Sequence, residues 1–145
     1  MNGSVYEGEY RDDKKNGVGV FRYDNGDVFE VCFNYNKQRL VRVSEGQNKN
    51  LILWDLRQKQ ALSYLDGHNN SVYCVDVSSD DNFAISGDRD SRVLYWDLVG
   101  MKLVCEFKGH YYSVFSVKFT KNRRFAVSGR EDKRIYVWDV ENQVE

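Results

Sequence analysis

The chain has 145 residues, with 21 basic and 22 acidic side chains and a formal net charge of −1. Because the charges nearly cancel, long-range attraction to nucleic acid or to an anionic membrane is not expected. The first residues lack an apolar core of signal-peptide length, and no stretch approaches the roughly 20 apolar residues of a membrane span, so we expect a soluble cytoplasmic protein. Zero prolines, ten tyrosines and eight phenylalanines favour strands joined by Gly/Asn/Asp turns.

The N-terminal part reads as β-hairpins punctuated by glycine. The segment "YEGEY" at residues 6–10 recurs 23 residues later as "FEVCF" at 29–33, with "GVGVFRYDNGD" between them. Within it, Asn25 and Gly26 form a two-residue turn signal, because both positions tolerate positive φ. This stretch resembles a MORN repeat, whose unit is a β-hairpin with glycines at fixed places. The second copy departs from that pattern where Val31 replaces a glycine.

A second period of 42 residues follows. The Trp-Asp pairs begin at Trp54, Trp96 and Trp138, and the Gly-His pairs at Gly67 and Gly109 share the same spacing. The stretch "SVYCVDVSSDDNFAISGDRDSRVLYWDL" aligns without a gap on "SVFSVKFTKNRRFAVSGREDKRIYVWDV". The preceding stretch, "FEVCFNYNKQRLVRVSEGQNKNLILWDL", is expected to fit the same register without a gap. The sequence therefore predicts three copies of one unit, the first degenerate at its start.

Each copy alternates apolar and polar residues in short runs, and a period of two predicts strands. In the second copy these runs are Val72–Val77, Phe83–Ser86, Val93–Trp96 and Leu103–Phe107. With its Gly-His and Trp-Asp pairs, the chain resembles the WD-repeat family over about residues 29–145. That resemblance implies four-stranded antiparallel blades arranged radially as a β-propeller.

The expected fold is all-β, with about three WD-type blades of an incomplete propeller behind a MORN-like hairpin. Residues 29–33 satisfy both patterns, and we infer that the hairpin runs directly into the first blade there; which pairing these residues adopt stays open. The predicted division is a hairpin at 1–28 and a partial propeller at 29–145, with blades at about 29–66, 71–108 and 113–145, the last lacking its outer strand.

The family resemblance also implies two structural tetrads of His, Ser, Asp and Trp. The same set at the repeat spacing favours hydrogen bonds that pin a turn over a catalytic triad, which needs one exposed serine. The first copy has Gly26 in place of the histidine, so its tetrad, with Ser44, Asn48 and Trp54, is incomplete. The predicted tetrads are His68, Ser86, Asp90 and Trp96, then His110, Ser128, Asp132 and Trp138.

No catalytic, cofactor or metal site is expected. The segment Gly17–Gly19 lacks the Lys-Ser/Thr and the helix that a phosphate loop requires. Both histidines belong to tetrads, and Cys32, Cys74 and Cys105 fall on separate predicted strands. These cysteines are expected as small buried apolar side chains in a reducing compartment.

Candidate partner-binding residues lie on the loops where partners of WD-repeat proteins commonly dock, before the first strand and between the second and third. Aromatic side chains and arginine are the residues that binding hot spots favour. The candidates are Asn69, Asn70, Tyr73, Arg89, Tyr111, Tyr112, Phe115 and Glu131.

Three blades are too few for a closed ring, since propellers close with about four to eight. The uncovered sheet faces and strand edges would then meet water. Three solutions remain open: a second copy completing a six-bladed ring, a different subunit supplying the missing blades, or a sequence that is a fragment of a larger propeller protein.

The predicted function is a non-enzymatic protein–protein interaction scaffold or a subunit of a larger assembly. By analogy with MORN-containing proteins, that assembly would be cytoskeletal or ciliary. One alternative is a membrane-surface adaptor using the hairpin, although residues 1–38 carry seven acids against five bases, the wrong balance for anionic lipid. Another is a regulatory part of a larger propeller protein or enzyme.

Overall fold

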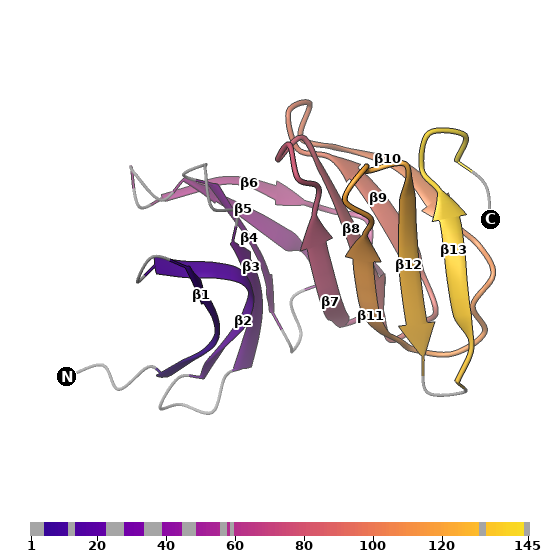
Figure 1. Cartoon of the computed structure of the whole chain (residues 1–145), viewed down its shortest axis with the longest axis horizontal. Helices are drawn as coiled ribbons and strands as arrows, with labels where there is room; N and C mark the ends of the chain where they lie inside the picture. Colours follow the sequence, from indigo (N-terminus) through magenta and orange to yellow (C-terminus); the bar gives the residue numbers. More distant parts are fainter. Residues whose placement is uncertain are drawn as a thin grey trace.

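The computed structural model describes residues 5–11, 14–22, 28–33, 39–44, 49–55, 58, 60–130 and 133–143. This part of the chain is all-β, as predicted, and forms three antiparallel sheets (Figure 1). It holds no helix of the length and apolarity needed to cross a bilayer. The predicted turn at Asn25 and Gly26 lies outside the described residues.

The first sheet has six strands in sequence order and joins the MORN-like hairpin to the first blade. Strand β3 pairs with β2 along one edge and with β4 along the other. Residues 29–33 therefore serve as hairpin strand and as blade strand at once. That the hairpin and the propeller part act as separate units remains a prediction. The strands are β1 (Val5–Arg11), β2 (Lys14–Arg22), β3 (Val28–Phe33), β4 (Arg39–Ser44), β5 (Leu51–Asp55) and β6 (Gln60–Leu65).

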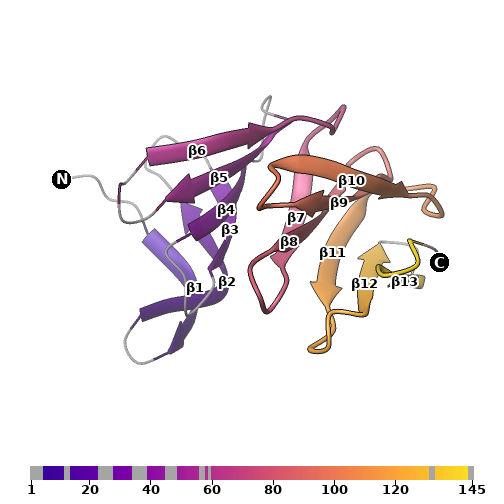
Figure 2. The same ribbon diagram turned by 90° about the horizontal axis from the view of Figure 1, so that it is seen from above.

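The other two sheets follow the 42-residue period. We call β3–β6 blade 1, the second sheet blade 2 and the third sheet blade 3. Seen from above, the inner strand β7 lies between β3 and β11 and contacts both, while β6 and β10 lie on the outside (Figure 2). Blade 2 comprises β7 (Val72–Val77), β8 (Phe83–Asp88), β9 (Val93–Asp97) and β10 (Lys102–Phe107). Blade 3 comprises β11 (Val114–Phe119), β12 (Phe125–Arg130) and β13 (Ile135–Asp139).

Blade 2 is covered on both faces. Successive side chains of a strand point to opposite faces of the sheet, so Leu94 and Trp96 pack toward blade 1 while Val93 and Tyr95 pack toward blade 3. Two apolar clusters result, one on each side of the central blade. The first holds Leu51, Leu53, Leu65, Val72, Val75, Ala84, Leu94, Trp96 and Leu98. The second holds Cys74, Ile85, Val93, Tyr95, Phe107, Val114, Val117, Ala126, Trp138 and Val140.

Blade 1 departs from the register of the other two blades. Trp96 lies across from Ala84 and Trp138 across from Ala126. The 42-residue spacing would place Arg42 across from Trp54, but Leu40 lies there instead. The ungapped alignment of the first copy is therefore wrong at β4, which is displaced along β5 by two residues. A two-residue slip leaves every side chain on its original face, so the apolar pattern does not distinguish the two registers.

Candidate functional site

The tetrad of blade 2 is a buried chain of hydrogen bonds. The Trp96 indole donates to Ser86 Oγ at 2.8 Å, and Ser86 Oγ lies 2.6 Å from Nε2 of His68. These side chains are 5 % exposed or less. They tie the loop before β7 to β8 and β9, and the buried serine is out of reach of a substrate.

The aspartate that completes this chain is Asp88, not the predicted Asp90. Asp88 Oδ2 lies 2.7 Å from Nδ1 of His68, and its other carboxylate oxygen accepts the backbone N–H groups of Asp90 and Arg92. Asp90 is exposed and instead accepts a 2.9 Å hydrogen bond from the Asn70 amide. Asp88 ends β8 and is fully buried, whereas Asp90 lies in the turn that follows. An aspartate two residues after the tetrad serine was the sequence signal for this position.

Blade 3 repeats only part of this chain of hydrogen bonds. The Trp138 indole donates to Ser128 Oγ at 2.7 Å, and Ser128 Oγ lies 2.5 Å from Nε2 of His110. The position of Asp88 is taken by Arg130, and the predicted Asp132 lies outside the described residues.

The second ring nitrogen of His110 differs from that of His68. Nδ1 is buried and has no hydrogen-bond partner within the described part of the chain. Burial, together with the positive charge of Arg130, lowers the pKa of His110 to about 4. The imidazole of His110 is therefore neutral at neutral pH.

In blade 1 the indole N–H of Trp54 is buried, and no described residue accepts its hydrogen bond. Gly26 and Asn48 lie outside the described residues, as does the side chain of Ser44. The backbone register offers a reason why Ser44 is not the equivalent of Ser86. Ser86 pairs with Leu94, whereas Arg42 holds the corresponding place across from Ile52.

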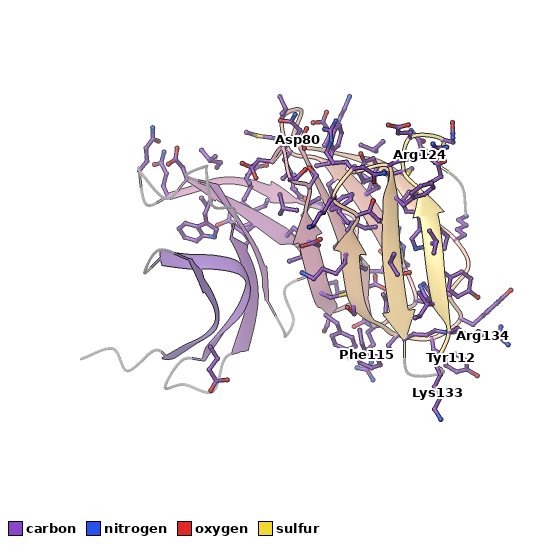
Figure 3. All side chains as sticks on the ribbon, viewed as in Figure 1. Asp80, Tyr112, Phe115, Arg124, Lys133 and Arg134 are labelled. Carbon is purple, nitrogen blue, oxygen red and sulfur yellow. The ribbon has the colours of Figure 1, made fainter. Side chains whose placement is uncertain are left out.

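Five of the predicted partner-binding residues lie at one end of blades 2 and 3. We call this end the rim surface, and the residues are Tyr73, Arg89, Tyr111, Tyr112 and Phe115. Tyr111, Tyr112 and Phe115 are 80 %, 65 % and 50 % exposed. The Phe115 ring stacks on the half-buried Tyr73 ring of the neighbouring blade, with centroids 5.4 Å apart and planes 4° apart. In Figure 3, Phe115 and Tyr112 lie at the end of the sheets opposite to Asp80 and Arg124.

Polar contacts fix the remaining parts of the rim surface. The Ser113 hydroxyl donates to the Arg89 carbonyl at 2.8 Å, joining the loops of neighbouring blades. The guanidinium of Arg130 lies over the Tyr112 ring, 5.3 Å from its centroid. Sequence reasoning missed Arg130 because an aromatic–cation contact has no signature in spacing. Asn69 is exposed, and Glu131 lies outside the described residues.

Within the part of the chain that the structure describes, no group of three His, Cys, Asp or Glu residues is placed to hold a metal ion. Cys74 is buried and Cys105 is partly buried, both as free thiols. Burial raises the pKa of Cys105, which keeps this thiol protonated. The expectation of no catalytic or metal site remains a prediction for the chain as a whole.

Family models match the chain at both periods. The model of the WD domain, G-beta repeat, matches residues 59–97 and 101–139, together more than half of the chain. The model of the MORN repeat matches residues 6–28. The chain therefore belongs to the WD-repeat family and carries one MORN repeat at its N-terminal side. WD repeats indicate a protein-interaction scaffold.

The chain is similar to parts of known proteins. Human Protein NEDD1 is 33 % identical over 58 residues, which is 40 % of this chain and 9 % of that protein. A crystal structure of RRP9 WD40 repeats superposes with a TM-score of 0.72 at 22 % identity, covering 78 % of this chain and 35 % of that one. The chain thus spans a minor part of both, and the structural match shows the propeller fold.

Proposed function

We propose that the chain is a non-enzymatic scaffold that binds a protein partner through the rim surface. The observation that carries this proposal is the exposure of Tyr111, Tyr112 and Phe115 on one side of a folded sheet pair. Large aromatic rings bury much apolar area on contact and dominate the affinity of protein interfaces. Three of them at one end of two blades are therefore a favourable docking surface.

Contacts within the single chain hold part of the rim surface in place. Tyr73 and Phe115 occupy equivalent places one residue inside β7 and β11 and stack on each other. The hydrogen bond from Ser113 to the Arg89 carbonyl links the two blades there. Because these groups are already ordered, binding loses less side-chain entropy than it would on flexible loops.

The scaffold would act as a subunit of a larger assembly, in which another protein completes the propeller. Three blades among the described strands fall short of the roughly four that closure needs. The MORN repeat supports, by analogy, a cytoskeletal or ciliary assembly in the cytoplasm. The buried serines of both tetrads support a non-enzymatic role.

The test is a quantitative pull-down from native extract with the double variant Tyr111→Ala/Tyr112→Ala. We expect partner recovery to fall by about tenfold or more, as for the loss of a hot spot. The matched control is Tyr64→Ala, because Tyr64 is 61 % exposed but lies on the outer strand of blade 1. Circular dichroism verifies that all variants fold. Equal recovery by the rim variant and the wild type would refute docking at this surface.

A further inference from the structure

We infer that a pocket between blades 2 and 3 binds an aromatic ring that carries a neutral carbonyl group. This inference goes beyond the proposed function, because it does not depend on docking at the rim surface. The pocket has a volume of about 280 Å³ and lies at the opposite end of the blades, where Asp80 and Arg124 are found (Figure 3). Its lining includes Phe83, Tyr95, Val104, Arg123, Val140 and Glu141.

The other interface of blade 2 shows why space remains here. Val104 and Val140 line the pocket, and the residues 42 positions earlier are Leu62 and Leu98. Both leucines pack in the apolar cluster between blades 1 and 2, where Leu98 is buried. Because valine is smaller than leucine, each of these two places holds less side-chain volume at the interface of blades 2 and 3. The pocket lies where the repeat has its smaller apolar side chains.

Aromatic rings form one wall of the pocket. Phe83 stacks on Tyr95, with ring centroids 5.2 Å apart and planes 20° apart. Tyr95 is also held from behind by the rings of Phe107 and Phe119. A further ring gains both apolar contact and a favourable ring–ring geometry against such a wall. An apolar cavity of about 150 Å³ is enough to hold benzene in a protein interior, so the pocket is large enough for a six-membered ring.

Polar groups at the pocket select what the ring carries. Burial raises the pKa of Tyr95 to about 12, so its hydroxyl keeps its proton and is a hydrogen-bond donor at neutral pH. The charge of Arg123 counteracts this rise in the pKa, which places the guanidinium near that hydroxyl. Arg123 is itself paired with the Asp80 carboxylate.

This arrangement favours a neutral acceptor over an anion. Asp80 and Glu141 both bring negative charge to the pocket, and they would repel a carboxylate on the ligand. A carbonyl oxygen accepts a hydrogen bond from the Tyr95 hydroxyl without that repulsion. Such a group belongs equally to an aromatic residue within a protein, through its backbone carbonyl, and to a free aromatic amide.

The test is an NMR titration of the isotope-labelled full chain with N-acetyl-phenylalaninamide and, separately, with benzamide. We expect saturable shifts of the backbone amide signals of Phe83, Tyr95 and Val140, with a Kd in the millimolar range that is usual for ligands of this size. Tighter binding of the first probe assigns the pocket to an aromatic residue of a protein, and tighter binding of benzamide assigns it to a free aromatic amide. Absence of saturable shifts at these residues with both probes would overturn the inference.

A pocket-filling variant assigns the shifts to this pocket. Val104→Phe places a ring in the space that the ligand needs and should weaken the binding of both probes by about tenfold or more. The matched control is Leu103→Phe, because Leu103 is the neighbouring residue of β10 but is exposed and does not line the pocket. Circular dichroism verifies that both variants fold. Undiminished binding in folded Val104→Phe would refute the site.

A second variant tests the carbonyl and does not depend on filling the pocket. Tyr95→Phe keeps the aromatic wall but removes the donor, so both probes should bind about fivefold more weakly, as for the loss of one hydrogen bond. Toluene, which has no carbonyl, should bind the variant and the wild type equally. Equal binding of the amide probes to both would overturn the choice of a carbonyl ligand. The rim variant Tyr111→Ala/Tyr112→Ala should bind the probes as the wild type does, so failure at the rim and failure here are told apart.

Discussion

Blade 2 and blade 3 are built from the same 42-residue pattern, yet only blade 2 is covered on both faces. Val93 and Ile135 hold equivalent places in β9 and β13, and one is fully buried while the other is largely exposed. The difference comes from the neighbour and not from the blade's own strands. A repeat unit stabilises itself only as far as the next unit covers its face.

The tetrads of the two blades differ at one charged residue. In blade 2 a carboxylate completes the hydrogen-bond chain at His68, whereas in blade 3 a guanidinium occupies that position near His110. One inversion of charge separates a buried network in which both ring nitrogens of His68 are paired from one in which Nδ1 of His110 has no partner among the described residues. We expect blade 3 to be the less stable blade for this reason as well.

The largest effect is expected from Asp88→Ala. This change removes the partner of His68 and the acceptor of two backbone N–H groups in the turn after β8. A loss of about 3 kcal/mol in the free energy of unfolding should follow, because buried polar groups are left without partners. Urea denaturation measures it. The matched control is Asp90→Ala, which should cost under about 1 kcal/mol because Asp90 is exposed.

The next largest effect is expected at Gly87, and the control is Gly129, which holds the equivalent place 42 residues later. Each substitution by alanine adds one methyl group. Gly87→Ala should lower the free energy of unfolding by about 1–3 kcal/mol, since its Cβ would overlap Val114 and the thiol of Cys74. Gly129→Ala should change it by less than about 0.5 kcal/mol, because no atom of the described residues, apart from the chain neighbours of Gly129, would lie within 4 Å of the added Cβ. Equal losses for both variants would show that the two glycines do not differ in their surroundings.

His110 should make the stability of the chain depend on pH. His110 has a pKa of about 4 in the folded chain and an ordinary value near 6.5 when unfolded. As the pH falls from about 6.5 to about 4, the unfolded chain takes up a proton that the folded chain does not, so stability declines in this window. NMR titration of the His110 ring measures its pKa directly. His110→Gln should remove this part of the pH dependence.

Replacing Arg130 by aspartate should make the hydrogen-bond chain of blade 3 resemble that of blade 2. In Arg130→Asp, a carboxylate stands where Asp88 stands beside His68, so the pKa of His110 should rise. The control is Arg134→Asp, which makes the same charge change at an exposed position. If both variants raise the pKa of His110 equally, net charge and not the local contact sets its value.

The smallest effect is expected from removing an ion pair between a turn of blade 2 and a turn of blade 3. Arg123 on the β11–β12 turn pairs with Asp80 on the β7–β8 turn, and both side chains are partly exposed. Arg123→Ala should lower the free energy of unfolding by about 0.5 kcal/mol, and less at high salt, because water screens the pair. If Arg123→Ala lowered the free energy of unfolding as much as Gly87→Ala does, ion pairs and not apolar contacts would be the main interactions that hold the blades together.

Most of the fold could be predicted from the sequence, because the apolar alternation and the constant spacing act locally. The strands of the second copy lie within two residues of the predicted ones, and the third copy has the three strands expected. Prediction did not extend to the register of β4 or the identity of the tetrad aspartate. A two-residue displacement of β4 leaves the alternation of its residues unchanged, and both Asp88 and Asp90 lie at the turn after β8.

By itself, the sequence determined the all-β class and the two repeat periods, since alternation and turn residues specify strands without help from distant contacts. That residues 29–33 pair with both β2 and β4 was decided by the tertiary structure. Only the tertiary structure decided which aspartate reaches His68, which glycine is packed and which is open, and which aromatic rings remain in water. Those outcomes depend on which surface lies against which, and a repeated pattern specifies its own strands but not the neighbour that covers them.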